Sequence, residues 1–187
     1  MRAHLDQGHR FDHVVRVARC ADLLAQRHGV DAGKARTAAM LHDLARLYSG
    51  ERLLAECERR GLRIGEFERR NPIVLHAPLG AALARERFDI DDPQVLSAIE
   101  KHTLADAEMS PLDCIVYLAD SLEPGRNFED RTLLWQLALR DLRAAMAATI
   151  ARSIEYLSEQ GREPAPQTLA ALRAFTTDTT EGLPSLN

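Results

Sequence analysis

The feature that constrains the fold most is the division of the chain into helix-forming segments with a cap or breaker at their ends. Ala, Leu, Arg and Glu, which favour helices, dominate the sequence. Alternating patterns of Val or Ile, which would indicate strands, are weak. Residues that start or end helices recur at Gly29, Asp31, Ser49, Gly61, Asp92-Pro93 and Ser110-Pro111. This pattern predicts an all-α fold of roughly eight or nine helices.

We expect these helices to form a single domain over residues 1–187, with its core at about 10–175 and a loose C-terminal tail at 176–187. The stretch 62–75 is less regular than its neighbours. In the first half of the chain we expect a helix at 11–28, a second that is capped by Asp31 and includes 38–45, a third at 49–61, and a fourth that follows Pro78 and ends at 88. In the second half we expect helices at 93–102 and 112–122, one or two helices within 129–159, and a short helix around 169–172.

Composition excludes several classes of protein. The 187 residues are 45% hydrophobic and 28% charged, which is typical of a folded chain with a full core. The net charge of −4 argues against a general nucleic-acid binder. No apolar run approaches the roughly 20 residues that a membrane span needs. Three scattered cysteines fit reduced thiols in a cytoplasmic protein better than a disulfide framework.

Six side chains that can bind a metal stand in or beside apolar segments: His13, His42, Asp43, His76, His102 and Asp120. Any one of them alone is more often a core or boundary residue with a single hydrogen bond. Together they are harder to explain in that way, because buried charge is costly unless it is paired or bound to a metal. Nitrogen and oxygen donors without a thiolate suit iron or manganese at least as well as zinc.

The adjacency of His42 and Asp43 restricts the geometry of such a site. Neighbours on a helix point about 100° apart, so both reach one metal only if it lies over the edge of the helix. Other helices would then cross nearby and carry His13 and Asp120.

The order of these residues resembles the metal site of the HD phosphohydrolase superfamily. In more detail, the sequence resembles the YqeK-type proteins, bacterial HD-domain hydrolases that cleave diadenosine tetraphosphate symmetrically. The resemblance runs from about residue 10 to residue 175. It rests on the segments Arg10-Phe11-Asp12-His13, Leu41-His42-Asp43-Leu44-Ala45-Arg46, Leu75-His76-Ala77-Pro78-Leu79-Gly80, Lys101-His102-Thr103, Ala119-Asp120-Ser121-Leu122-Glu123-Pro124-Gly125-Arg126 and Gly161-Arg162-Glu163-Pro164.

The resemblance implies a role for each matching residue. His13, His42, Asp43 and Asp120 would hold a metal, with iron the expected choice and manganese or another divalent ion the alternative. His76 and His102 would hold a second ion or contact the bridging phosphates, and would act in catalysis with Asp43. Arg10, Arg46 and Arg126 would face phosphate oxygens, and the segment from Pro164 to Thr168 would border the adenosine.

The implied reaction is the attack of a metal-bound hydroxide on a bridging phosphate, which would release two ADP molecules. Asp43 would bridge two ions if two bind. The sequence departs from the family pattern at Arg46, where Lys is usual, and at Ala77, where Gly is frequent. Arg46 keeps a charge for phosphate, although Arg and Lys are not equivalent there. Ala77 could alter the loop that presents His76.

Three alternatives stay open at this point. The first is an HD phosphohydrolase for another nucleotide, although no Gly-Tyr-Pro motif follows His42-Asp43 to favour a cyclic dinucleotide. The second is a nucleotide sensor that uses the metal only to hold its ligand. The third is a helical interaction module without a metal. A homodimer also stays open, because helical domains often pack in pairs.

Overall fold

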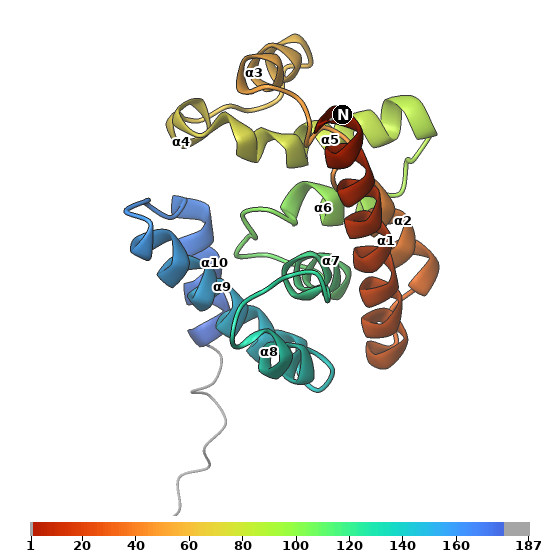
Figure 1. Cartoon of the computed structure of the whole chain (residues 1–187), viewed down its shortest axis with the longest axis vertical. Coiled ribbons are helices and arrows are strands. Elements are labelled where there is room, and N and C mark those ends of the chain that lie inside the picture. The colour runs from red at the N-terminus through yellow and green to blue at the C-terminus, as the bar shows by residue number, and fades with distance from the viewer. Residues whose placement is uncertain (1, 178–187) are drawn as a thin grey trace, which may run out of the picture.

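The computed structural model of the chain describes residues 2–177, which form ten α-helices and one 3₁₀-helix in a single helical assembly (Figure 1). The helices are α1 (Arg2–His28), α2 (Ala32–Leu41), α3 (Gly50–Arg59), α4 (Glu66–Arg70), η1 (Pro72–Leu75), α5 (His76–Phe88), α6 (Pro93–Lys101), α7 (Pro111–Leu122), α8 (Arg131–Ala138), α9 (Leu142–Glu159) and α10 (Pro166–Thr177). The described residues contain no strand, which confirms the all-α prediction. Residues 178–187 of the expected tail lie outside the described part of the chain.

Helix α7 lies at the centre of this arrangement. It packs against α1, α2, α6, α8 and α9. Figure 1 shows α1 and α2 on one side of it and α9 and α10 on the other. Residues 112–119 of α7 are all buried, as expected for a helix that is apolar on every face. The main core surrounds this helix, and a smaller core of residues such as Leu53, Leu75 and Leu83 lies beneath α3 and α5.

The predicted caps are confirmed by the hydrogen bonds at the helix ends. The side chain of Asp31 accepts from the Lys34 amide, and Ser49 caps α3 in the same way. Ser110 and Asp113 form a reciprocal capping box at the start of α7. Each of these bonds satisfies an amide that the first turn of a helix would leave without a partner.

Some helix boundaries differ from the prediction. Helix α1 begins at Arg2, and α5 begins at His76, two residues before Pro78. Pro78 is tolerated there because the first turn of a helix needs no amide hydrogen bond. The irregular stretch 62–75 contains α4 and η1. The region 129–159 divides into α8 and α9, which is the second of the two predicted alternatives. The count therefore exceeds eight or nine because short helices fill segments whose local pattern was indistinct.

The difference that matters most for the site is the early end of α2. The helix ends at Leu41, although the apolar pattern continues to Ala45. Residues 42–47 form successive turns instead, with hydrogen bonds from Leu44 to Leu41 and from Arg46 to Asp43. We call this segment the 42–47 turn. Gly80 of α5 lies close against it, since a Cβ atom there would be 3.3 Å from the His42 carbonyl oxygen.

Cys20, Cys57 and Cys114 are buried free thiols. Among the residues from 2 to 177, no helix has the length and hydropathy that crossing a membrane would require.

Candidate active site

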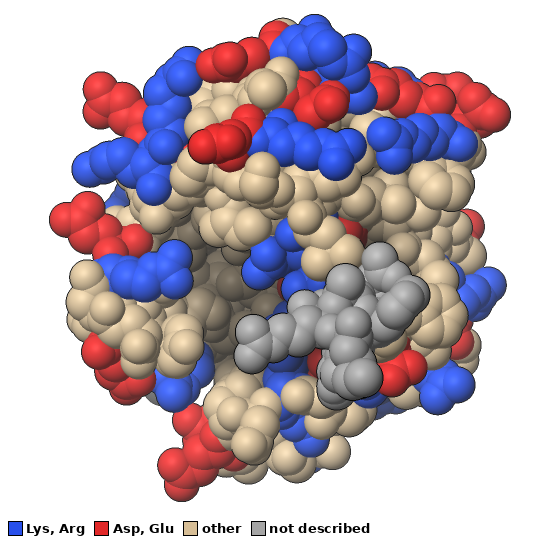
Figure 2. Space-filling model, turned by 45° about the horizontal axis from the view of Figure 1, so that its top comes forward, with Lys and Arg blue, Asp and Glu red and all other residues tan. Residues whose placement is uncertain are grey.

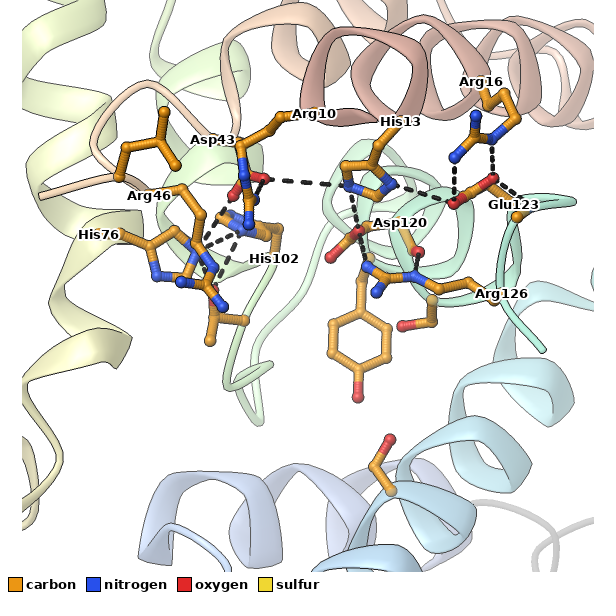
Figure 3. Close-up of a pocket in the computed structure, with 16 residues that line it drawn as sticks. Arg10, His13, Arg16, Asp43, Arg46, His76, His102, Asp120, Glu123 and Arg126 are labelled. Atoms are coloured by element: carbon orange, nitrogen blue, oxygen red, sulfur yellow. Dashed lines mark hydrogen bonds and ion pairs between the residues drawn. The ribbon is translucent and has the colours of Figure 1, made fainter. Parts of the chain in front are cut away.

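The six candidate ligands, which are far apart in the sequence, meet in one place. His13 comes from α1, His42 and Asp43 from the start of the 42–47 turn, and Asp120 from α7. His76 opens α5 and His102 follows the last residue of α6. Figure 3 shows five of these side chains, those of His13, Asp43, His76, His102 and Asp120, converging from separate parts of the chain.

Their donor atoms form three overlapping groups in which all atoms lie within 4.8 Å of one another. The groups are His13, His42 and Asp43; His42, His102 and Asp120; and Asp43, His76 and His102. The Nε2 atom of His13 lies 3.1 Å from Oδ1 of Asp120, and the Nε2 atom of His76 lies 3.4 Å from Oδ1 of Asp43. His42, at the C-cap of α2, still has helical dihedral angles of φ −57° and ψ −35°, and Asp43 follows it in the 42–47 turn.

Three of the histidines share one orienting device. Each follows a helical turn and places its Nδ1 atom against the backbone carbonyl three residues earlier: His42 on Ala39 at 2.6 Å, His76 on Ile73 at 2.5 Å and His102 on Ile99 at 2.7 Å. A carbonyl oxygen can only accept, so Nδ1 carries the proton and donates it. Neutral imidazole then leaves the Nε2 lone pair free to bind a metal.

The Nε2 atoms of His42, His76 and His102 lie close together with too few protons to bond to, so a cation or a proton is needed between them. The Nε2 atoms of His76 and His102 lie 3.1 Å apart, and both bear lone pairs in the tautomer that Nδ1 imposes. The hydroxyl of Thr103 lies within 3.2 Å of each, but it has only one proton to donate. The Nε2 atom of His42 is buried and has no hydrogen-bond partner among the described residues. This donor set fits a divalent metal ion.

His13 is held by Glu123, a residue that the sequence analysis did not single out as functional. The Nδ1 atom of His13 lies 3.1 Å from Oε1 of Glu123. Glu123 also accepts from Nε of Arg16 at 2.5 Å and from the amide of Gly125 at 2.5 Å. The signals in the sequence were its position directly after the apolar run of α7 and its place in the segment 119–126, which carries part of the family resemblance.

Burial and charge set the protonation states that a metal needs. Burial lowers the pKa of His102 to about 3 and also lowers the pKa of His76, so both are neutral at physiological pH. Burial by itself would raise the pKa values of Asp43 and Asp120. The charges of neighbouring histidines and, for Asp120, the hydrogen bond from His13 bring both pKa values below 3.8 instead. His76 and His102 therefore present neutral nitrogens and the two carboxylates present anionic oxygens, whereas the burial of His13 is outweighed by hydrogen bonds with Asp120 and Glu123, which raise its pKa.

The three predicted phosphate-binding arginines line the cavity above these ligands. The cavity has a volume of about 680 Å³. Arg10 donates to Asp43 at 2.7 Å and Arg126 to Asp120 at 2.5 Å, while Arg46 lies on the same wall. Figure 2 shows the hollowed face of the molecule with Lys and Arg side chains along the margin of the hollow. Their positive charge suits an anionic ligand.

The segment from Pro164 to Thr168 does not line this central cavity. Thr168 is buried, and its hydroxyl donates to the Leu104 carbonyl at 2.8 Å, so it ties α10 to the preceding loop. Residues 165–167 line a second cavity of about 640 Å³, which adjoins the central cavity at Thr103. The Thr168 hydroxyl thus makes a structural contact, and the expectation that the segment from Pro164 to Thr168 borders the adenosine stays a prediction.

Comparison with known proteins gives three findings. Residues 10–125 match the HD domain family. The chain is 34% identical to the symmetrical bis(5'-nucleosyl)-tetraphosphatase of Halalkalibacterium halodurans over 91% of this chain and 90% of that protein. It is 32% identical to the protein of the same name from Bacillus subtilis, with 86% of each chain covered.

A solved structure extends the likeness to three dimensions. It is the crystal structure of a protein from Clostridium acetobutylicum described as a predicted HD superfamily hydrolase involved in NAD metabolism. The two structures superimpose with a TM-score of 0.86 at 34% identity, over 89% of this chain and 88% of the other.

Proposed function

This chain belongs to the HD domain family, and we propose that it is a metal-dependent phosphohydrolase that cleaves diadenosine tetraphosphate symmetrically into two ADP molecules. The observation that carries the proposal is the convergence of six nitrogen and oxygen donors beneath an arginine-lined cavity. The relatives named symmetrical tetraphosphatases are similar in sequence to this chain over most of their length, which supports the proposed substrate and reaction.

The ligands divide into two sets that share one residue. His13, His42, Asp43 and Asp120 are proposed to hold one ion, for which iron is our choice and manganese the alternative. Asp43 also belongs to a group with His76 and His102, so it is the natural ligand to bridge to a second ion. A divalent ion supplies a nucleophilic water at neutral pH and neutralises charge on phosphoryl oxygens.

The residues above the ligands act on the phosphate chain. Arg10, Arg46 and Arg126 are proposed to bind the oxygens of the phosphate chain, because the guanidinium group matches phosphate geometry. Its hydrogen bonds to these oxygens become stronger as negative charge develops on them. His76 and His102 lie beside Asp43 at the opposite end of the site from Arg126 (Figure 3). They are proposed to contact the reacting phosphates directly or through the second ion. ADP is a good leaving group and needs little help from an acid.

Several wider statements also belong to this proposal. We propose that residues 10–175 act as one domain, and that the enzyme works in the cytoplasm, where its three free cysteines would stay reduced. The net charge of −4 is the reason to expect no nucleic-acid substrate. A homodimer stays open.

Product analysis tests the proposal. The full chain is incubated anaerobically with Fe²⁺ or Mn²⁺ and diadenosine tetraphosphate, and the nucleotides are separated by anion exchange. ADP as the only product is expected. ATP together with AMP would refute symmetric cleavage, and no turnover by protein with bound metal would favour another nucleotide or a sensor.

Matched variants separate the metal site from the rest of the surface. Asp43→Ala is expected to lose metal and turnover, by roughly 100-fold or more. Asp91→Ala removes a carboxylate whose side chain is 87% exposed and is expected to change neither. Retention of both metal and turnover by Asp43→Ala would contradict the proposed ligand set.

A further inference from the structure

Symmetric cleavage imposes a requirement on the space around the metal ligands. The central anhydride must lie at the site, so each half of the substrate extends from it by two phosphates and one nucleoside. Two nucleoside sites are then needed, one on each side of the central cavity. This inference rests on the proposed function and extends it to the second half of the substrate.

Cavities adjoin the central cavity at both of its ends. At the His76 and His102 end, the 640 Å³ cavity is reached past Thr103. At the other end, a cavity of about 410 Å³ shares Asp120 and Arg126 with the central one. Figure 3 shows Arg126 and His76 at opposite sides of the ligand cluster. We call the 410 Å³ space the Tyr156 cavity.

The Tyr156 cavity is formed by the loop after α7 and by one face of α9. Phe128 of the loop and Tyr156 of α9 contribute aromatic rings, and Arg152 adds a cation. Tyr156 is 54% exposed, although it is a large aromatic residue. The volume of the Tyr156 cavity, about 410 Å³, lies within the range of roughly 300–1,000 Å³ that is typical of small-molecule sites.

A buried hydroxyl in its wall points to a polar ligand. Thr149 of α9 lines the cavity and is 2% exposed. Its Oγ1 atom has no hydrogen-bond partner among the residues that the structure describes. An unsatisfied buried hydroxyl is costly, so a partner supplied by a ligand or by a ligand-bound water would recover that free energy.

We propose that the Tyr156 cavity binds the nucleoside of one half of the dinucleotide. The base stacks on the Tyr156 and Phe128 rings, as aromatic side chains stack on unpaired bases in other nucleotide sites. The hydroxyl of Thr149 bonds to the nucleoside directly or through one water. Arg126, which both cavities share, binds the phosphate that joins this nucleoside to the central anhydride.

The chemistry of the wall favours a nucleoside over the other occupants. Arg126, beside Asp120, and Arg152, near Glu155 and Glu159, make part of the wall polar and charged, which favours a ligand that carries a phosphate over a purely apolar one. The aromatic rings add nothing for an isolated phosphate. A planar base followed by a ribose and a phosphate meets the rings, the hydroxyl and Arg126 in that order.

The test compares two variants with a matched control in the full, Mn²⁺-loaded chain. Tyr156→Ala removes the stacking ring, and Thr149→Val removes the hydroxyl while keeping a similar shape. Phe88→Ala truncates an aromatic side chain that is 51% exposed and lines none of these cavities. Tyr156→Ala is expected to raise KM for diadenosine tetraphosphate roughly 5- to 150-fold, the effect of losing one base–aromatic stack. Thr149→Val is expected to raise it roughly 2- to 10-fold.

Calorimetry with ADP gives a second, independent readout. The wild-type chain is expected to bind two ADP molecules, and Tyr156→Ala is expected to bind one. If the wild type cleaves the substrate but Tyr156→Ala and Thr149→Val behave like Phe88→Ala, the cavity is not a nucleoside site and the proposed function stands. If the wild type does not cleave the substrate, the proposed function fails. The number of bound ADP molecules then still tests the assignment of the cavity. If the wild type and Tyr156→Ala bind the same number of ADP molecules, the Tyr156 cavity is not a nucleoside site.

Discussion

Replacement of Glu123 tests whether a buried carboxylate outside the ligand set controls the metal site. Its side chain is 2% exposed and accepts hydrogen bonds from His13, Arg16 and the Gly125 amide. Burial would raise the pKa of Glu123, but these hydrogen bonds lower it to about 2, so the group is anionic at any working pH. Glu123→Gln keeps the shape and removes the charge, whereas Glu123→Ala removes both.

The expected magnitudes follow from these contacts. The Arg16 side chain is 35% exposed, so water replaces much of its lost ion pair. The Nδ1 proton of His13 and the Gly125 amide have no such replacement in Glu123→Ala. We expect that variant to lose about 3–5 kcal/mol of unfolding free energy, and Glu123→Gln to lose about 1–2 kcal/mol. Metal affinity is expected to fall roughly 10-fold in Glu123→Gln and roughly 100-fold in Glu123→Ala, because His13 is no longer held.

The assays are Mn²⁺ competition with a chelating dye, steady-state kinetics and denaturant unfolding. Glu86→Gln serves as the control, since Glu86 is 46% exposed and forms an ion pair with Arg60 at the surface. It is expected to change stability by less than about 0.5 kcal/mol. A double-mutant cycle with His13→Ala then decides the mechanism. If Glu123 acts through His13, the losses of metal affinity are strongly non-additive, and additive losses would refute the reasoning.

Three further predictions follow from the same geometry. Removal of metal by a chelator is expected to lower stability by about 2.7 kcal/mol relative to protein with free metal at 100 times its Kd; equal melting temperatures with and without the chelator would contradict a metal held by the native fold. The metal-free protein is expected to lose stability as the pH falls from about 6.5 toward 3, because burial lowers the pKa of His102 to about 3 and the unfolded chain binds the proton first. His76 acts in the same direction, and His13, whose pKa is raised, acts only above that window. A denaturation midpoint at pH 4.5 that equals or exceeds the midpoint at pH 6.5 would show this to be wrong. Gly80→Val is expected to push the 42–47 turn away from α5, with a loss of about 1–3 kcal/mol and weaker Mn²⁺ binding; unchanged binding would show that this close approach does not position the ligands.

The sequence predicted the parts of the fold that local chemistry decides. Asp31, Ser49 and Ser110 cap helices because each side chain accepts a bond from an amide two or three residues later, and that spacing is visible in the sequence. The end of α2 was not predictable in this way. The pattern of apolar residues continues through Leu44 and Ala45, while the turn that interrupts it is fixed by packing against α5, far along the chain.

The site shows the same division between local and distant causes. The six donors could be named because their residue types and order resemble a known metal site. Glu123 could not, because its contact with His13 spans 110 positions and depends on how α1 and α7 cross. The segment from Pro164 to Thr168 is still predicted to border the adenosine, but the hydrogen bond of the Thr168 hydroxyl to the Leu104 carbonyl could not be foreseen from its sequence. Side-chain direction at the end of a helix depends on tertiary packing, which the pattern of the segment does not contain.

The position of the site along the chain has a consequence for how such proteins can diversify. All six donors lie within residues 10–125, the part that matches the HD domain family. The Tyr156 cavity takes most of its wall from later in the chain, including Tyr156 on α9. The 640 Å³ cavity takes only residues 165–167 from there, and Gln167 lies in the first turn of α10. Mutations in the last third of the gene can therefore change which molecule is selected while the inherited metal chemistry stays intact. At the Tyr156 cavity, such changes would fall in α8, α9 and the loop before them.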